Sequence, residues 1–329
     1  MLIVSVVIPI YRVETYIERC VRSLFEQTYE DIEFVFVDDC SPDASIDILY
    51  RVMAEYPLRQ SYVRVFCNEK NVGSASARNV GLNIARGEYV TFVDADDWIE
   101  EDGIEKMMQC AEETGADIVM SDFTMDSDGV LSISKQGFEK SDSLSLMKAM
   151  MTGKLHGSNC NKIYRRSLIE DNNIRFIDGA DYTEDLAFNM KLLSLTNKIT
   201  YLPIAYYHYC IRYESMSQKV VPSDIARKKD LQKVINVSDF SNWLYSRGLG
   251  NELEQEINYC KLIAKMPFLF VVTRRSCLRW CALFPEANKA IMANDRLPFT
   301  YKLELQLLRI KWISLFVWLQ HMKIRLAKL

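Results

Sequence analysis

Three carboxylates follow one short apolar segment of the chain. Residues 90–93 are apolar or β-branched and predict a buried strand, and Asp94, Asp96 and Asp97 come directly after it. Carboxylates this close together repel one another unless a positive charge lies among them. Such a ligand set suits Mg²⁺ or Mn²⁺, hard cations that take oxygen ligands and often bind phosphate oxygens as well. The alternative is an acidic turn that ends the strand and caps the next helix.

A second acidic pair, Asp38 and Asp39, follows another apolar segment that predicts a buried strand over residues 32–37. Strand and helix patterns alternate four times, which predicts an α/β fold with a mainly parallel sheet and right-handed crossovers. Ligands of such sheets bind beyond the carboxyl ends of the strands. We therefore expect both acidic groups at one crevice. The other predicted elements are strands at 3–10, 62–67 and 117–120, and helices at 14–28, 74–85, 102–114 and from Ser41 as N-cap to about residue 54.

The composition is that of a globular protein. The chain has 329 residues, of which 49% are hydrophobic and 26% are charged, enough for a large core and more than one domain. The formal net charge of −4 argues against a nucleic-acid-binding protein. The nine cysteines and three histidines lack zinc-site spacing, and the odd cysteine count favours a reducing, cytoplasmic compartment. No dinucleotide-binding or P-loop motif follows a predicted strand.

Four segments together resemble the family 2 glycosyltransferases, which have the GT-A fold. They are residues 6–11, 37–43, 75–81 and 93–98, and their order and spacing match the family over about the first hundred residues. Weaker similarities lie at residues 161–166, 183–188, 207–209 and 215–217, and the resemblance fades beyond about residue 219. It implies a GT-A catalytic domain over residues 1–219, followed by a mostly helical region over residues 220–329.

The resemblance assigns five residues to the nucleotide. Pro9, Tyr11 and Glu14 match the loop that lines the nucleoside pocket, where Tyr11 could stack on a base. Asp39 matches a carboxylate that meets uracil, whose N3–H can donate to it, whereas cytosine has no such donor. Arg78 matches a residue near the diphosphate, and a guanidinium suits phosphate geometry. From the residues alone, the alternatives are an ordinary tyrosine, a helix cap and a solvated arginine.

The resemblance also implies a metal site. Asp96 would hold the metal, and Asp94 would reach the ribose or contact the metal through water. His208 is similar to part of a segment that closes over the diphosphate, which makes it a further candidate ligand; a core histidine is the alternative. Trp98 would line the sugar or acceptor site, or pack in the core. Many members carry arginine where this chain has Cys210.

The expected reaction needs a base. The metal would neutralise charge on the departing nucleoside diphosphate, and the acceptor hydroxyl must lose a proton as it attacks. The resemblance places the base in the pair Glu184 and Asp185, where we choose Asp185 as the base and expect Glu184 to orient the acceptor. One displacement with one base implies inversion at the anomeric carbon. The alternative is that Thr183 caps a helix whose first turn favours acids.

The sequence therefore predicts an inverting, metal-dependent glycosyltransferase. It would move a sugar from a UDP-sugar to a hydroxyl of a glycan or lipid-linked oligosaccharide in surface polysaccharide synthesis. A nucleotidyltransferase that forms sugar nucleotides is one alternative, although no glycine- and basic-rich loop follows the first predicted strand. A non-catalytic membrane scaffold that binds nucleotide-sugars is the other, and it would not need Asp185.

The C-terminal region predicts helices at residues 225–237, 240–246, 252–265 and 302–326. Residues 312–322 are uncharged and apolar, and they are too few to span a bilayer. Basic residues lie on both sides of this segment, a pattern that favours peripheral contact with an anionic membrane. We therefore expect the protein at the inner face of the cell membrane. The alternative is a helix docked on the catalytic domain or on a second copy in a homodimer.

Overall fold

The computed structural model describes residues 3–127, 129–138, 142–211, 223–295 and 297–326. Residues 215–217, which carry part of the weaker family similarity, lie outside these ranges. The chain forms two compact units, Met1–Met147 with Leu155–Val220, and Lys148–Lys154 with Val221–Leu329. The sequence did not indicate that residues 148–154 belong to the second unit. The roles assigned to the two predicted domains remain predictions.

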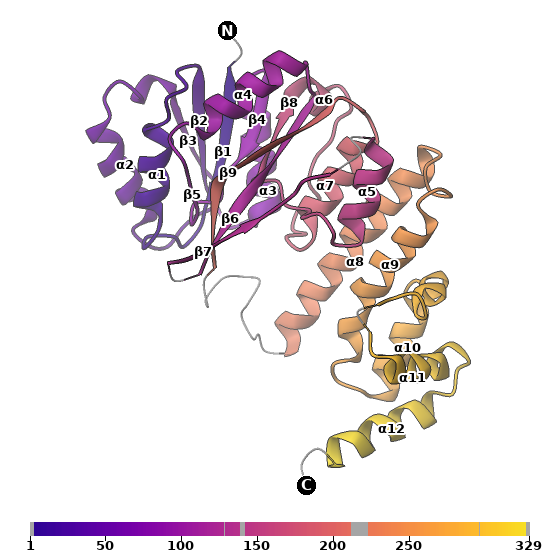
Figure 1. Cartoon of the computed structure of the whole chain (residues 1–329). Helices are drawn as coiled ribbons and strands as arrows, with labels where there is room; N and C mark the ends of the chain where they lie inside the picture. The colour runs from indigo at the N-terminus through magenta and orange to yellow at the C-terminus, as the bar shows by residue number, and fades with distance from the viewer. Residues whose placement is uncertain (1–2, 128, 139–141, 212–222, 296, 327–329) are drawn as a thin grey trace. The chain divides into compact units, whose positions relative to one another are not determined.

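The first unit is built on one sheet with helices packed against it (Figure 1). Within the described residues the strand order is β3-β2-β1-β4-β8-β6-β9-β5, and β7 pairs with β6. The strands are β1 (Val4–Ile10), β2 (Ile32–Asp38), β3 (Val63–Cys67), β4 (Tyr89–Phe92), β5 (Trp98–Ile99), β6 (Ile118–Ser127), β7 (Val130–Ser134), β8 (Lys162–Arg165) and β9 (Ile199–Ile211).

The sheet is mixed rather than mainly parallel. Strands β3, β2, β1 and β4 are parallel neighbours, as predicted. The short strand β8 then pairs antiparallel with β4 and with β6, so β6 does not continue the parallel series. Strand β9 runs parallel to β6, and β5 pairs antiparallel with β9. The α/β class is confirmed, and the acidic loop after β4 lies near the middle of the sheet.

Helices of the first part of the chain are α1 (Ile17–Phe25), α2 (Ser45–Glu55), α3 (Ser74–Ile84), α4 (Gly103–Thr114), α5 (Ser143–Met151), α6 (Arg166–Glu170) and α7 (Glu184–Leu193). Helix α1 buries Val21 and Leu24 in the sheet core, as its apolar spacing predicts. Helix α3 lies very close to β1, because a Cβ at Gly81 would come within 2.3 Å of a Val7 methyl carbon. Glycine at this position therefore sets how near α3 comes to the sheet.

The predicted start of α2 is wrong. The helix begins at Ser45, with Ala44 at the N-cap position and no side-chain cap. Ser41 instead donates to Asp43 (2.6 Å) and accepts from the backbone N–H of Arg12 (2.8 Å). Its hydroxyl thus joins the loops after β1 and β2, and this local use competes with helix capping.

The second unit is helical around a core that includes Trp280, Leu262 and Phe316. Its helices are α8 (Ser223–Ser246), α9 (Glu254–Lys265), α10 (Arg274–Ala282), α11 (Phe299–Arg309) and α12 (Ile313–Leu326). The first two predicted helices form the single helix α8. The last predicted helix is two helices, because Lys311 has a positive φ of 63° that interrupts it. Across the described residues, no helix combines the length and the apolar character needed to cross a bilayer.

Candidate active site

Arg78 brings the separate acidic segments together. It lies on α3, and its side chain is 7% exposed. Its Nη2 donates to Oδ1 of Asp94 at 2.8 Å, directly after β4. Its Nη1 lies 3.1 Å from Glu184 Oε1 and 3.7 Å from Asp185 Oδ1, in the first turn of α7. Four residues predicted from the sequence therefore meet in one partly buried cluster, in which Arg78 is the most buried side chain.

This cluster is short of positive charge. Burial, followed by the charge of Asp185, raises the pKa of Glu184 to about 8. Burial also raises the pKa of Asp185, although the Arg78 charge partly opposes this shift. One guanidinium thus serves three carboxylates, a condition that favours a further cation. The carboxylate oxygens of Asp94, and of the half-buried Asp96 two residues later, fit Mg²⁺ or Mn²⁺.

The third predicted metal ligand, His208, contacts Trp98 and Glu100. His208 stacks on Trp98, with ring centroids 3.5 Å apart, and its Nε2 lies 2.7 Å from Glu100 Oε1. Over the described ranges, no group of three or more His, Cys, Asp or Glu side chains has the arrangement of a metal site. The ligand set Asp94, Asp96 and His208 therefore remains a prediction, and the packing of His208 also fits the core-histidine alternative.

Trp98 lines a cavity of about 680 Å³ between α1 and β5. The Arg19 guanidinium of α1 lies 5.5 Å from the centroid of the Trp98 ring, within cation–π range. Arg19 Nη2 also lies 2.7 Å from the sulfur of Cys210. The family resemblance leads us to expect an arginine at position 210, and Arg19 of α1 instead brings a guanidinium to Cys210. The predicted role of Trp98 in lining the sugar or acceptor site remains a prediction.

Asp97 makes structural hydrogen bonds and is not part of the cluster around Arg78. It is 1% exposed, and its oxygens accept hydrogen bonds from Tyr207 Oη (2.6 Å) and the backbone N–H of Cys210 (2.8 Å). Burial, reinforced by the Asp94 charge, raises its pKa to about 8. Asp97 therefore ties the acidic loop to β9.

Asp39 fixes the loop between β3 and α3. It is 2% exposed, and its oxygens accept from Asn68 Nδ2 and from the backbone N–H groups of Val72 and Gly73, each at 2.9 Å. This loop leads directly into the helix that carries Arg78. The predicted contact of Asp39 with uracil remains a prediction, and the loop contacts are a second role that its sequence position did not indicate.

The other predicted nucleoside residues surround the end of β1. Pro9 is half-buried in β1, opposite Val37 of β2. Tyr11 is 39% exposed in the loop that follows, where an aromatic ring is available to a ligand. Glu14 is exposed, and its carboxylate accepts from the backbone N–H of Ala44 at 3.0 Å. Their contact with a nucleoside remains a prediction.

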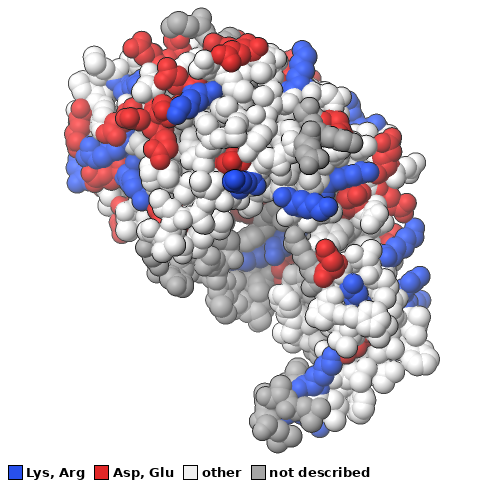
Figure 2. Space-filling view, viewed as in Figure 1, with Lys and Arg blue, Asp and Glu red and all other residues white. Residues whose placement is uncertain are grey.

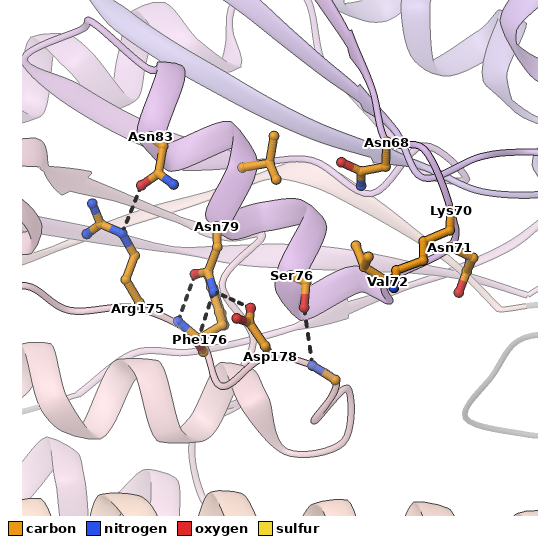
Figure 3. A pocket seen from close by; sticks show the side chains of 12 residues that line it. Asn68, Lys70, Asn71, Val72, Ser76, Asn79, Asn83, Arg175, Phe176 and Asp178 are labelled. Atoms are coloured by element: carbon orange, nitrogen blue, oxygen red, sulfur yellow. Dashed lines mark hydrogen bonds between the residues drawn. The ribbon is translucent and has the colours of Figure 1, made fainter.

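The segment before α7 is hydrogen-bonded to α3. A cavity of about 680 Å³ lies beside α3. Figure 3 shows residues that line it, among them Asn79 and Phe176. The Asn79 amide binds the backbone N–H and C=O of Phe176, each at 2.9 Å, and the N–H of Gly179 donates to Ser76 at 3.2 Å. These bonds fix how α7 starts, and hence where Glu184 and Asp185 lie relative to Arg78.

Sequence reasoning missed one residue that contacts the proposed base. The side-chain amide of Asn159 donates to Asp185 Oδ1 at 2.8 Å, and its backbone N–H donates to Oδ2 at 3.2 Å. The available signal was a pair of asparagines, Asn159 and Asn161, directly before the apolar strand β8. Thr183, the alternative cap for α7, has a positive φ of 63° and no side-chain cap hydrogen bond.

Solved structures share this architecture. Residues 1–349 of TarS from S. aureus align with a TM-score of 0.68 and 23% identity, covering 96% of this chain and 89% of that chain. The same fragment in complex with UDP-GlcNAc aligns with a TM-score of 0.64. The mannosyltransferase PcManGT from Pyrobaculum calidifontis, in complex with GDP-Man and Mn²⁺, gives a TM-score of 0.53 at 16% identity, covering 98% of this chain and 86% of that chain. The fold is that of the GT-A glycosyltransferases.

Sequence comparison agrees with the fold. The family model described as Glycosyl transferase family 2 matches residues 5–172. Putative glycosyltransferase EpsH of Bacillus subtilis (strain 168) is 36% identical over 228 residues, which cover 66% of this chain and 63% of that protein. Glycosyltransferase GlyA of Streptococcus pneumoniae is 35% identical over 65% of this chain but only 31% of its own length. The chain belongs to glycosyltransferase family 2, and it spans less than two thirds of the length of these two relatives.

Proposed function

We propose that this chain transfers a sugar from a UDP-sugar to a hydroxyl of a glycan or lipid-linked acceptor, with inversion and with a divalent metal. The observation that supports the proposal most strongly is the partly buried cluster in which Arg78 joins Asp94 to Glu184 and Asp185. The UDP-GlcNAc complex of TarS supports a UDP-sugar as the donor. A poly(ribitol-phosphate) β-N-acetylglucosaminyltransferase among the relatives supports a polymer as the acceptor.

Each residue has a definite part in this proposal. Asp185 accepts the proton of the attacking hydroxyl, and Glu184 stays hydrogen-bonded to Arg78 beside it. Arg78 contributes the fixed positive charge near the diphosphate. Asp94 and Asp96 hold the divalent ion, which when bound neutralises charge on the departing diphosphate.

The first test of this proposal is UDP release from UDP-glucose and UDP-GlcNAc, with water as acceptor. We expect slow release from one donor in Mn²⁺ that is lost on adding EDTA. The same loss is expected in Asp96→Ala, because its carboxylate would no longer hold the ion. Asp102→Ala, which removes a nearby surface carboxylate that pairs with Lys106, is the matched control and should keep the activity.

Two results would contradict the proposal. One is a protein that binds no UDP compound, with or without Mn²⁺, in calorimetry. The other is pyrophosphate release from UTP and a sugar 1-phosphate, which would indicate a nucleotidyltransferase instead.

We further propose that α12, together with Lys311 and Trp312 directly before it, contacts an anionic membrane surface. Trp312, Leu315 and Trp318 are spaced three residues apart and are 60%, 38% and 57% exposed. The basic residues Lys311 and Arg325 beside them are exposed as well. Figure 2 shows basic side chains next to uncharged surface along α12. Exposed tryptophans with basic neighbours suit the headgroup region of an anionic bilayer.

Vesicle sedimentation tests the membrane proposal. We expect binding to phosphatidylcholine vesicles that contain phosphatidylglycerol, and much weaker binding without it, because basic side chains attract anionic headgroups. Trp312→Ser with Trp318→Ser should weaken binding at least about tenfold, whereas Tyr245→Ser, which removes an exposed aromatic of α8, should not. Absence of vesicle binding, together with a dimer in analytical ultracentrifugation that the tryptophan variants disrupt, would show a protein interface instead.

A further inference from the structure

One residue holds both carboxylate oxygens of Asp185. Asn159 donates its side-chain N–H to Oδ1 and its backbone N–H to Oδ2, at 2.8 and 3.2 Å. Asn159 is 1% exposed, so water does not compete at its amide. Both oxygens of the proposed base are thereby fixed from the side of β8.

The orientation of the Asn159 amide is itself determined by its neighbours. Its Oδ1 accepts from Tyr164 Oη at 2.9 Å and from Asn189 Nδ2 at 2.7 Å. Because the Asn189 amide nitrogen can only donate and the ionised Asp185 carboxylate can only accept, the nitrogen of the Asn159 amide must face Asp185. Tyr164 and Asn189 are both 0% exposed, so this assignment holds in a buried, closely packed network.

The network joins the two elements that meet beneath the base. Tyr164 lies on β8, and Asn189 lies on α7, one turn after Asp185. Asn189 also donates to the backbone carbonyl of Asp185 at 3.0 Å. Lys162, which is fully buried, binds Asn161 Oδ1 at 2.9 Å and holds the segment that carries Asn159. The position of the carboxylate thus depends on the neutral Asn159 amide that this network holds, in addition to the Arg78 guanidinium 3.7 Å from Oδ1.

We propose that Asn159 is a positioning residue that keeps Asp185 ionised and aimed at the acceptor hydroxyl, an inference that rests on the proposed function. Burial, reinforced by the Asp94 charge, raises the pKa of Asp185, and the Arg78 charge, the hydrogen bond from the Asn159 backbone and the Lys162 charge oppose this rise. An amide suits this task because it donates without carrying a charge of its own. It therefore restrains the carboxylate without forming an ion pair that would weaken it as a base.

The test is the pH profile of UDP release in Asn159→Ala. We expect kcat to fall about 10- to 100-fold, because the base is no longer held in line with its target. The acid limb of kcat/KM should move up by about one pH unit, because the carboxylate loses a donor that favours its ionised form. The KM for the donor should stay unchanged, since Asn159 contacts the base and not the predicted nucleotide residues.

Two further variants keep the inference falsifiable. Tyr164→Phe keeps the ring and removes only the hydroxyl that orients Asn159, so we expect a smaller shift of the acid limb in the same direction. Asn258→Ala, which removes a buried asparagine of the second unit, controls for loss of stability and should leave the pH profile unchanged. An unaltered acid limb in folded Asn159→Ala, or an equal shift in Asn258→Ala, would overturn the inference.

Failure of the inference differs from failure of the proposed function. If Asp185→Asn releases UDP as fast as the unmodified chain, Asp185 is not the base and both ideas fall. If Asp185→Asn is inactive while Asn159→Ala keeps the normal rate and pH profile, the proposed function stands and Asn159 has no positioning role.

Discussion

An Asp185→Asn variant is expected to lose sugar transfer by a factor of about 10² to 10⁴, the usual contribution of a general base. The side chain keeps its shape but no longer accepts the proton of the acceptor hydroxyl. UDP release at saturating donor, measured with and without acceptor, gives the loss in kcat. The KM for the donor should change little, because the carboxylate acts on the acceptor.

Two control measurements are needed to interpret a loss of activity in Asp185→Asn. Glu184→Gln changes the neighbouring acid in the same helical turn and should retain much more activity, since Glu184 is committed to Arg78. The UDP affinity of Asp185→Asn, measured by calorimetry, should match that of the unmodified chain. Activity that survives Asp185→Asn but disappears in Glu184→Gln would reverse the assignment of the base within the pair.

Arg78→Met is expected to destabilise the protein by about 3–5 kcal/mol, the usual cost of removing one partner from buried ion pairs. The change would leave three carboxylates near one another without their shared cation, in a site where Arg78 is only 7% exposed. Urea unfolding of the metal-free protein measures the loss. Arg165→Met, which breaks ion pairs of a side chain that is 26% exposed, is the control, with an expected cost of about 1 kcal/mol or less.

The cost of Arg78→Met should also depend on pH. The pKa of Glu184, about 8, is raised above its value in the unfolded chain, so its contribution to stability is full at low pH and is lost as the pH rises toward 8. Without the Arg78 charge, that pKa rises further and the loss at high pH becomes larger. We therefore expect the variant to be destabilised more at pH 8.5 than at pH 6. An equal cost at both pH values would mean that the carboxylates do not depend on Arg78.

The parallel half of the sheet could be predicted because its information is local. Strands β1 to β4 are short apolar runs, and their predicted limits agree with the structure to within one residue. Strand β5 has two residues and β8 has four, too few to show a period. The break between α11 and α12 was missed because Lys311, with its positive φ, is neither glycine nor proline.

The site residues could be predicted from the sequence only where they belong to a recognised motif. Asp94, Arg78 and Asp185 belong to recognisable segments, and the structure brings them together. Asn159 belongs to no such segment. Its amide is oriented by Tyr164 and Asn189, which approach it only after β8 and α7 have packed. The environment of His208 could not be predicted either, because its partner Glu100 lies 108 residues earlier and contacts it only through the pairing of β5 with β9.

The pairing of β5 with β9 also sets an order of events during synthesis. Asp97 depends on donors from Tyr207 and Cys210, which are 110 and 113 residues further along the chain. At about 5–20 residues per second, a ribosome needs about 5–20 s to make that interval. For this time the nascent chain already contains the four parallel strands and the acidic loop, but Asp97 has neither donor. We therefore expect the addition of β9 to be the late, slow step by which a newly made molecule acquires its active site.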